Sequence, residues 1–223
     1  DLQYLEIGKY ISKYYSYFVF NNDSLIWDWQ NKHPNAQSIP RKIGILGRMP
    51  YYWSEYKYSE FFKDYKRNVL TEYARMPQQS KIPNCMYLED MPEQDWRILE
   101  DTLTINSYLC QKAMCHFRGR DYIAWFAIDI PINNGPWKFG GLPGLILKVY
   151  DSQRLYTFEC IKVENGKFPI MKYRFKNYKP TERNKLLRLQ RKINENFYQT
   201  AGLIPFGRGK APAPTSYEPL ELE

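Results

Sequence analysis

Short apolar runs, separated by turn-forming residues, recur through the second half of the chain. The runs cover residues 94–100, 107–118, 121–128, 145–150, 155–163 and 168–178. Gly119 and the pair Asn165-Gly166 lie between runs, where glycine can adopt a positive φ and Asn-Gly is a strong hairpin signal. Successive runs of this kind pair with their neighbours in sequence. The pattern therefore predicts an antiparallel meander that forms a curled sheet or half-barrel.

A helix is expected after the last of these runs. Thr181 follows Pro180 as a candidate N-cap, and Gly202 is placed to end the element. Between them, apolar residues recur at helical spacing, at Leu186, Leu189, Ile193 and Phe197. We predict a helix over about 181–199 that packs on the sheet through this stripe.

The first half of the chain has a weaker pattern. We expect a strand within 2–15, a short helix capped by Asp23-Ser24, a long connection over 35–54, and a hairpin of 56–65 and 69–75. Together the elements predict a mainly β fold of the α+β class. Residues 1–204 are interpreted as one domain, and the Pro- and Gly-rich residues 205–223 as an irregular tail.

Composition excludes two classes of protein. No stretch approaches the roughly 18 consecutive apolar residues of a membrane-spanning helix, so we expect no integral membrane protein. The four cysteines form no C-x-x-C pair, and the chain has only two histidines. The sequence therefore predicts neither a metal site nor a cofactor.

Positive charge is concentrated in one segment. Residues 162–192 hold eleven Lys or Arg and two Glu, a net charge of +9, whereas the whole chain carries +8. Strand and helix periodicity would place six of these cations on one surface: Lys172, Arg174, Lys176, Arg188, Arg191 and Lys192. Such a surface could bind a protein partner, an anionic envelope surface or nucleic acid, or it could be an ordinary solvated face.

Trp137 and Lys138 are a second candidate for partner binding, because they lie in a loop rich in Gly and Pro. The alternative is that the tryptophan anchors the loop to the core, as large aromatic residues in such loops often do.

Catalytic chemistry finds little support in the sequence. His116 and Cys115 are the one adjacent pair of imidazole and thiol, and strand alternation points them to opposite faces. We therefore assign no catalytic residue and expect no enzyme activity.

The segment of residues 110–149 resembles the GLPGLI family of exported proteins from Gram-negative bacteria. It contains the six residues of that name at 141–146, preceded by Phe117-Arg118-Gly119-Arg120 and by Gly135-Pro136-Trp137-Lys138-Phe139. The resemblance implies an exported protein of the periplasm or outer membrane and names no reaction. It also implies an oxidising compartment, in which some of the four cysteines would pair. Cys110 and Cys115 could not pair with each other, because five residues of strand separate them by about 17 Å.

Residue chemistry indicates a structural role for the motif itself. It comprises Gly140, Gly141, Leu142, Pro143, Gly144, Leu145 and Ile146. Glycines here permit unusual dihedral angles and close backbone approach, and proline fixes φ. A phosphate-binding loop is the alternative, but the lysine-hydroxyl pair and following helix of a P-loop are missing. We interpret the motif as a structural corner at the entry to a strand.

These observations predict a non-catalytic envelope protein that binds a partner or serves as an accessory, for example to an outer-membrane transport system. The partner would be an envelope protein or an anionic surface, and nucleic acid is disfavoured by the inferred compartment. The main alternative is a half-barrel carrier of an apolar or lipid-like ligand. A hydrolase ranks third.

Overall fold

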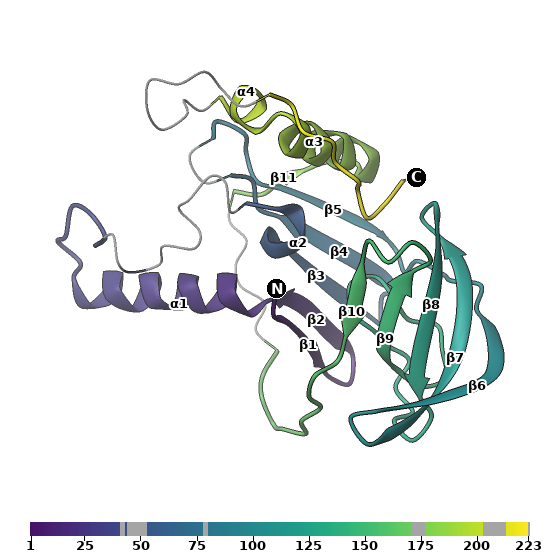
Figure 1. The fold of residues 1–223 in the computed structure, drawn as a ribbon. Coiled ribbons are helices and arrows are strands. Elements are labelled where there is room, and N and C mark those ends of the chain that lie inside the picture. Colours follow the sequence, from purple (N-terminus) through teal and green to yellow (C-terminus); the bar gives the residue numbers. More distant parts are fainter. Residues whose placement is uncertain (41–42, 44–52, 78–79, 171–176, 203–212, 223) are drawn as a thin grey trace. The chain divides into compact units, whose positions relative to one another are not determined.

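The computed structural model describes residues 1–40, 43, 53–77, 80–170, 177–202 and 213–222. Within these residues the protein is mainly β, with two sheets that do not close into a barrel and a helix near the C-terminus (Figure 1). This agrees with the predicted fold class. No helix in the described part of the chain is long and apolar enough to cross a membrane.

The chain forms two compact units, which are described separately. The first unit contains residues 1–89 and 172–217, and the second contains residues 90–171 and 218–223. Each unit is therefore built from two stretches of chain, and residues 90–171 of the second unit lie between the two stretches of the first.

A six-stranded sheet forms the first unit. Its strands are β1 (Gln3–Ile7), β2 (Ile11–Ser16), β3 (Ser59–Asp64), β4 (Val69–Ala74), β5 (Cys85–Asp90) and β11 (Lys179–Pro180), and they lie in that order. Neighbours from β1 to β4 pair antiparallel, whereas β11 pairs parallel to β5. The helices of this unit are α1 (Tyr17–Lys32), α2 (Glu55–Tyr58), α3 (Arg183–Glu195) and α4 (Phe197–Ala201).

Helix α3 packs on this sheet through the predicted apolar stripe. Leu186 and Ile193 are buried in a core that also contains Ala74 of β4 and Tyr87 of β5. Glu182, not Thr181, occupies the N-cap position, and the helical stretch ends at Gly202 with a φ of 65°. The predicted helix is thus present but interrupted at Asn196, which has a φ of −144° and separates α3 from α4. It packs on the sheet of the first half of the chain instead of on the meander.

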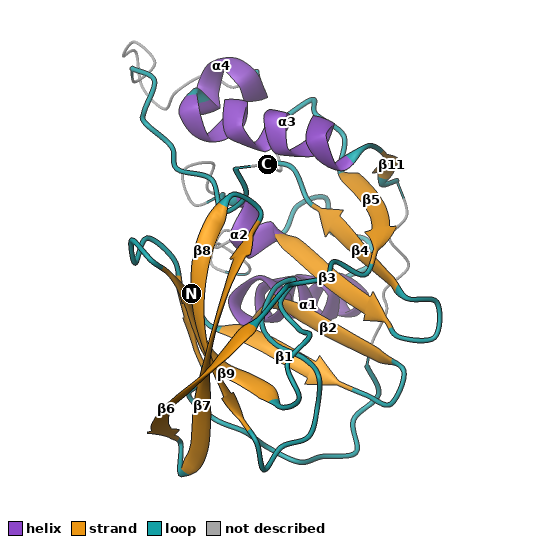
Figure 2. Cartoon of the chain, turned by 90° about the vertical axis from the view of Figure 1, so that its right-hand side faces the viewer, coloured by secondary structure: helices purple, strands orange, loops and turns teal. Residues whose placement is uncertain are grey.

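The second unit contains the predicted meander. Its strands are β6 (Arg97–Ile105), β7 (Tyr108–Phe117), β8 (Arg120–Ala127), β9 (Leu145–Asp151) and β10 (Thr157–Glu159), in the order β10-β9-β8-β7-β6. All four neighbouring pairs are antiparallel. Figure 2 shows how strongly these strands bend and twist. Register shifts in the β6–β7 and β8–β9 pairs contribute to this shape, because bulges increase local twist.

The core of the second unit is aromatic. Phe139 is fully buried, and its ring lies 4.8 Å from Tyr122, 5.1 Å from Trp137 and 5.8 Å from Phe117, measured between centroids. Trp96 and Phe158 lie slightly farther from Phe139. The loop of residues 128–144 thus supplies the central side chain of a core that the strands surround.

Several element boundaries differ from the sequence predictions. The strand expected in 2–15 is a hairpin of β1 and β2, in which Gly8 donates to the carbonyl of Ile11. The helix expected to start at Asp23-Ser24 begins at Tyr17, because Ser16 caps it through the amide of Val19. Ser24 lies inside α1 and donates to the carbonyl of Phe20.

The hairpin predicted over 56–75 is confirmed by β3 and β4. Its turn is fixed by the carboxylate of Asp64, which accepts hydrogen bonds from the amides of Lys66 and Arg67 at 3.1 and 3.0 Å. Asn68 follows with a φ of 53°. The strand expected over 155–163 covers only 157–159, and residues 168–170 form no strand.

Candidate functional site

Four cations lie exposed on helix α3. We call this surface the α3 cationic face; it consists of Lys185, Arg188, Arg191 and Lys192. Leu186 and Ile193, at 1% and 0% exposure, occupy the opposite side of the helix and bind it to the sheet. Because α3 is anchored in this way, its cations are held at fixed helical spacings.

Nearby acids partly neutralise the α3 cationic face. Lys185 pairs with Glu182 at 2.8 Å, and this hydrogen bond lowers the pKa of the Glu182 carboxyl. Arg191 pairs with Glu195, also at 2.8 Å. Arg188 donates to the carbonyl of Asn184, and no side chain in the described residues pairs with Lys192. The face therefore retains a net charge of +2, from four cations and two carboxylates.

The structure supports only part of the predicted basic surface. Arg188, Arg191 and Lys192 lie together on α3, as predicted. Lys172, Arg174 and Lys176 lie outside the described residues. Their contribution to the same surface stays a prediction.

Trp137 and Lys138 are buried, at 4% and 1% exposure. The Trp137 ring packs edge-on against Phe117 and Phe139, with centroids 5.8 and 5.1 Å apart. The Lys138 ammonium forms an ion pair with Glu221. Trp137 and Lys138 therefore do not form an exposed binding surface. Trp137 instead anchors its loop to the core, which was the alternative interpretation.

The glycine motif makes a tight corner before β9. Gly141 has a φ of 81°, and its amide donates to the side chain of Asn133. A Cβ on Gly144 would lie 2.1 Å from the carbonyl oxygen of Ala127, so the two backbones touch. Leu145 and Ile146 then enter β9. This geometry agrees with the structural interpretation of the motif.

Trp96 holds the same corner from outside the motif. Its indole donates to the carbonyl of Gly140 at 2.7 Å, and Gln94 accepts from the Gly140 amide at 3.0 Å. These contacts span more than 40 residues of sequence, so periodicity could not reveal them.

His116 and Cys115 face opposite sides of β7, as predicted. His116 is exposed, and its Nδ1 lies 2.7 Å from a carboxylate oxygen of Asp121 on the neighbouring strand. The Cys115 thiol is buried, which raises its pKa to about 12, with a smaller contribution from Asp121. A thiol in that state is a weak nucleophile at neutral pH. The three groups therefore do not form a catalytic arrangement.

Two buried carboxylates in the first unit had no signal in the sequence. Glu55 of α2 accepts from Asn194 at 2.7 Å, and Glu72 of β4 accepts from Ser59 at 2.7 Å. Gln190 of α3 also donates to Glu72, at 3.4 Å. Burial raises the pKa of Glu55, and the charge of Glu72 raises it further. Two of these hydrogen bonds connect α3 to its neighbours: Asn194 to α2 and Gln190 to β4.

The four cysteines are free: Cys85, Cys110, Cys115 and Cys160. The expected pairing of some of them is therefore absent. Cys85 is buried on β5, and Cys110 and Cys115 are both buried on β7. Among the described residues, no three His, Cys, Asp or Glu side chains gather in a way that could hold a metal ion.

A family described as "Protein of unknown function (Porph_ging)" matches residues 118–148. This short stretch includes the glycine motif. The match shows similarity to an uncharacterised family and does not confirm the GLPGLI assignment. No curated protein matches the chain.

Two solved structures of a protein named PNGF-II are similar in fold. The form in space group C2 has a TM-score of 0.51 at 14% identity and covers 83% of this chain. The form in space group P21 has a TM-score of 0.52 at the same identity and covers 82%. The matched region is only 29% and 28% of the PNGF-II chain. At this identity the likeness concerns the fold alone: this chain is similar in fold to less than a third of PNGF-II.

Proposed function

We propose that the protein is a non-catalytic binding protein of the bacterial cell envelope that binds an acidic protein partner through the α3 cationic face. The observation that carries this proposal is the two-sided character of α3. One side is buried in the core at Leu186 and Ile193, and the other presents four exposed cations. A rigid helix with this arrangement offers a defined pattern of charge to a partner.

The local acids do not prevent such binding. The pairs of Lys185 with Glu182 and Arg191 with Glu195 are solvent-exposed, with every side chain at 38% exposure or more. Exposed pairs contribute only about 0–1 kcal/mol. A partner that brings several carboxylates at once can therefore replace them at little cost.

The envelope location and a role beside an outer-membrane transport system rest on the resemblance of residues 110–149 to exported proteins. The basic segment of residues 162–192 is consistent with both the envelope location and the accessory role. Charge of one sign speeds association with an oppositely charged partner, and this attraction weakens with salt.

The carrier alternative is less favoured by the packing of the second unit. A half-barrel carrier needs free apolar space against its curved sheet. Phe139 packs there against Tyr122 and Trp137, at centroid distances of 4.8 and 5.1 Å. We therefore base the proposal on a surface and not on an enclosed cavity.

Capture from envelope extract tests the proposal. The full chain is immobilised, and bound proteins are identified by mass spectrometry at about 50 and 300 mM salt. We expect captured acidic proteins whose yield falls with salt, and a loss of about tenfold or more in the triple variant Arg188→Glu, Arg191→Glu, Lys192→Glu, because each reversal replaces attraction by repulsion.

The matched control reverses three exposed cations elsewhere in the same unit, Lys9, Lys66 and Arg67. This variant has the same net charge as the first but keeps the α3 cationic face. It should retain most of the capture. Equal losses in both variants, or capture that ignores salt and substitutions, would contradict the proposal.

A further inference from the structure

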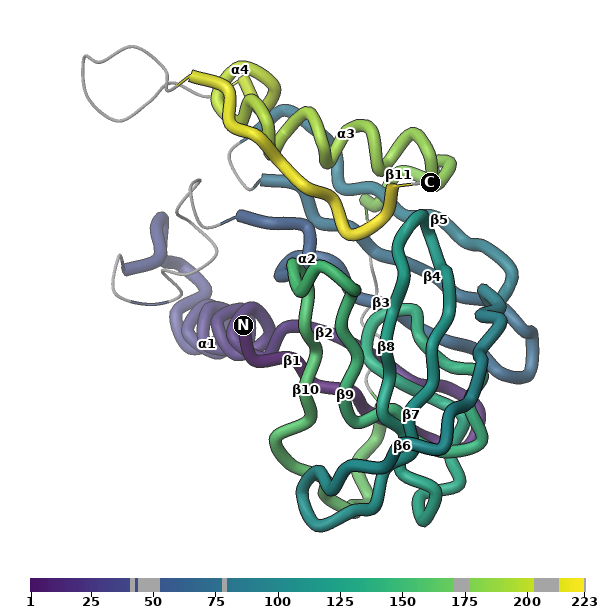
Figure 3. Tube along the Cα trace, turned by 45° about the vertical axis from the view of Figure 1, so that its right-hand side comes forward, coloured from purple at the N-terminus to yellow at the C-terminus, as the bar shows by residue number. Residues whose placement is uncertain are grey.

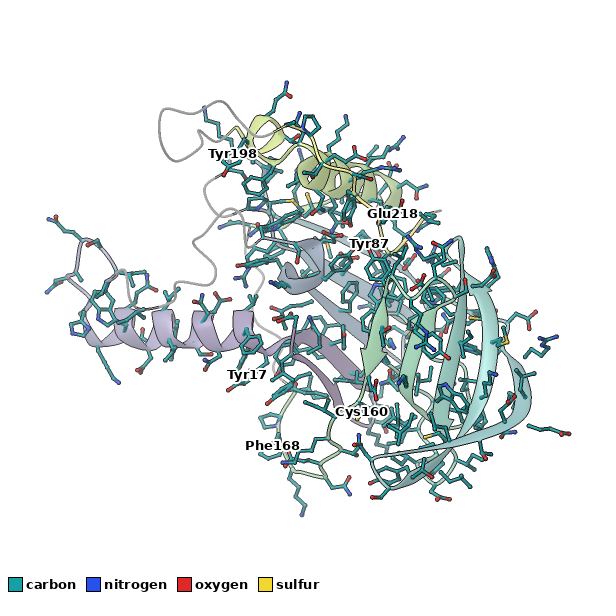
Figure 4. All side chains as sticks on the ribbon, in the orientation of Figure 1. Tyr17, Tyr87, Cys160, Phe168, Tyr198 and Glu218 are labelled. Carbon is teal, nitrogen blue, oxygen red and sulfur yellow. The ribbon has the colours of Figure 1, made fainter. Side chains whose placement is uncertain are left out.

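The end of the described chain binds the second unit as an extended peptide. We call residues 218–222 the C-terminal segment; its sequence is Glu-Pro-Leu-Glu-Leu. It contains no helix or strand, and Figure 3 shows it at the end of an extended yellow trace. Leu220 and Glu221 are buried at 5% and 6% exposure. The exposed side chain of Glu218, labelled in Figure 4, begins the segment.

Side chains of the second unit bind the backbone of the segment. Three successive carbonyls accept hydrogen bonds: that of Glu218 from Tyr156, that of Pro219 from Arg120 and that of Leu220 from Tyr122. The Arg120 guanidinium lies 2.6 Å from the Pro219 carbonyl oxygen, and the Tyr122 hydroxyl lies 3.3 Å from the Leu220 carbonyl oxygen. In return the amide of Leu222 donates to the carbonyl of Arg118 at 3.0 Å. Recognition of consecutive backbone groups is how many domains bind extended peptides.

Buried cations bind the acidic side chains of the segment. Glu221 forms ion pairs with Lys138 and, at 3.7 Å, with Arg118. Glu218 lies 3.4 Å from Arg120. The side chains of Lys138 and Arg120 are 0% and 5% exposed, so these charges are held inside the protein. Asp151, at 3.7 Å from Arg120, helps to fix that guanidinium.

We propose that Arg118, Arg120, Tyr122, Lys138 and Tyr156 form a peptide-binding site for extended acidic segments, which the chain's own C-terminal segment fills. The ligand is an extended stretch of a partner protein with two carboxylates three residues apart and a leucine before the second. The carbonyl contacts accept any backbone, whereas the buried cations and the Leu220 position select the sequence. This site is separate from the α3 cationic face, and the inference does not depend on it.

A second copy of the same chain is the weaker source of such a ligand. Its segment would make the same contacts as the resident one. The resident segment follows directly on residues held by hydrogen bonds, Thr215 to Glu195 and Tyr217 to Tyr56. A tethered ligand competes at an effective concentration near the millimolar range. Exchange between copies therefore gains nothing, whereas a different protein can bring a stronger segment or additional contacts.

A labelled peptide of residues 216–222 tests the site in the full chain by fluorescence anisotropy. The variant Glu221→Lys places a cation against Lys138 and Arg118, which should expel the resident segment and free the site. We expect this variant to bind the peptide at least tenfold more tightly than the unaltered chain does, because the resident segment no longer competes. The same peptide with glutamine at both glutamate positions should bind at least tenfold more weakly.

Two further variants keep the test decisive. Glu221→Gln preserves side-chain size and frees the site more gently, in case Glu221→Lys fails to fold by circular dichroism. Adding Arg120→Ala to either opened variant should abolish peptide binding, since it removes the donor to Pro219 and the partner of Glu218. The proposal would be overturned if Glu221→Lys or Glu221→Gln folds but does not bind the peptide, or binds the glutamine peptide equally well. Dimers of the unaltered chain that the peptide dissociates would overturn the assignment to a partner protein and point to a second copy.

Discussion

Gly144 and Gly202 are required for different physical reasons. A methyl group on Gly144 would meet the backbone carbonyl of Ala127 at 2.1 Å, and backbone cannot move aside cheaply. Gly202 has open space around it but a φ of 65°. We expect Gly144→Ala to lower the free energy of unfolding by about 2–4 kcal/mol through overpacking, and Gly202→Ala by about 1 kcal/mol through left-handed strain. Urea denaturation of both variants measures the difference, and equal effects would contradict the corner interpretation.

Glu55 should make stability depend on pH. Its pKa in the folded protein lies above the ordinary value of 4.5, mainly because burial disfavours the charged carboxylate. As pH rises above about 4.5, the unfolded chain releases this proton first, so stability falls until the raised pKa is passed. Glu55→Gln should remove this loss, since an amide can still accept from Asn194.

The free energy of unfolding of the Glu55→Gln variant, measured at intervals between pH 4 and 8, checks this sign. The gain over the unaltered chain should grow with pH. The exposed Glu182, whose pKa is lowered by its hydrogen bond with Lys185, provides the matched control. Relative to the unaltered chain, Glu182→Gln should lose stability as pH rises through the acidic range, which is the opposite sign. A gain from Glu55→Gln that shrinks with rising pH would contradict the assignment.

Thiol reactivity should separate the four cysteines. Cys160 is partly exposed, whereas Cys110 and Cys115 are buried at 0% and 7% exposure. Burial also raises the pKa of the Cys110 and Cys115 thiols, which lowers their thiolate fractions. We expect iodoacetamide to label Cys160 first in the folded protein and the others only after denaturation. Peptide mass spectrometry reads the order, and a disulfide in protein purified from an oxidising compartment would contradict the free-thiol arrangement.

At the scale of one element, α3 separates stability from binding. Ile193 is fully buried in the core of the first unit, and its neighbour Lys192 is exposed. We expect Ile193→Ala to cost about 2–4 kcal/mol through loss of burial and creation of a cavity, and Lys192→Ala to change stability by less than about 0.5 kcal/mol. Thermal or urea unfolding measures both. A large cost from Lys192→Ala would mean that the α3 cationic face supports the fold.

Local patterns explain which elements the sequence could predict. Strands β7 and β8 are long, alternate in burial and are joined by a tight turn at Arg118-Gly119, so neighbouring residues carry all the information. Helix α1 buries only Val19 and Asn22, and Trp27 remains 67% exposed. A helix with so little buried surface has no apolar stripe to detect.

The candidate sites also differ in whether local sequence or distant residues determine them. Arg188, Arg191 and Lys192 follow from helical spacing within one element, so the sequence placed them correctly. Lys138 appeared available for binding because its partner Glu221 lies 83 residues away in sequence. The peptide-binding site was missed for this reason, since its donors and its ligand meet only in the folded chain. A Pro-rich tail that ends in alternating acidic and apolar residues is the one signal that could have indicated it.

At the scale of the whole molecule, the two units should respond separately to damage. Phe139 lies at the centre of the aromatic core of the second unit. We expect Phe139→Ala to destabilise that unit by about 3–5 kcal/mol and to lose hydrogen-exchange protection in β7–β9 while β2–β4 keep most of theirs. Exchange mass spectrometry resolves the two sets of amides. Equal losses in both would show that the units unfold together.

The division of the first unit into residues 1–89 and 172–217 sets an order for folding during synthesis. The ribosome releases the chain from its N-terminus, so β1–β5 emerge first but lack the helix that covers Ala74 and Tyr87. Strands β6 to β9 follow, and each of β7, β8 and β9 pairs with the strand made just before it. Low-contact-order pairing of this kind is fast. The sheet of the second unit can therefore form before helix α3 and residues 218–222 are made. During that interval the first unit exposes an apolar face, and the nascent chain most needs a chaperone.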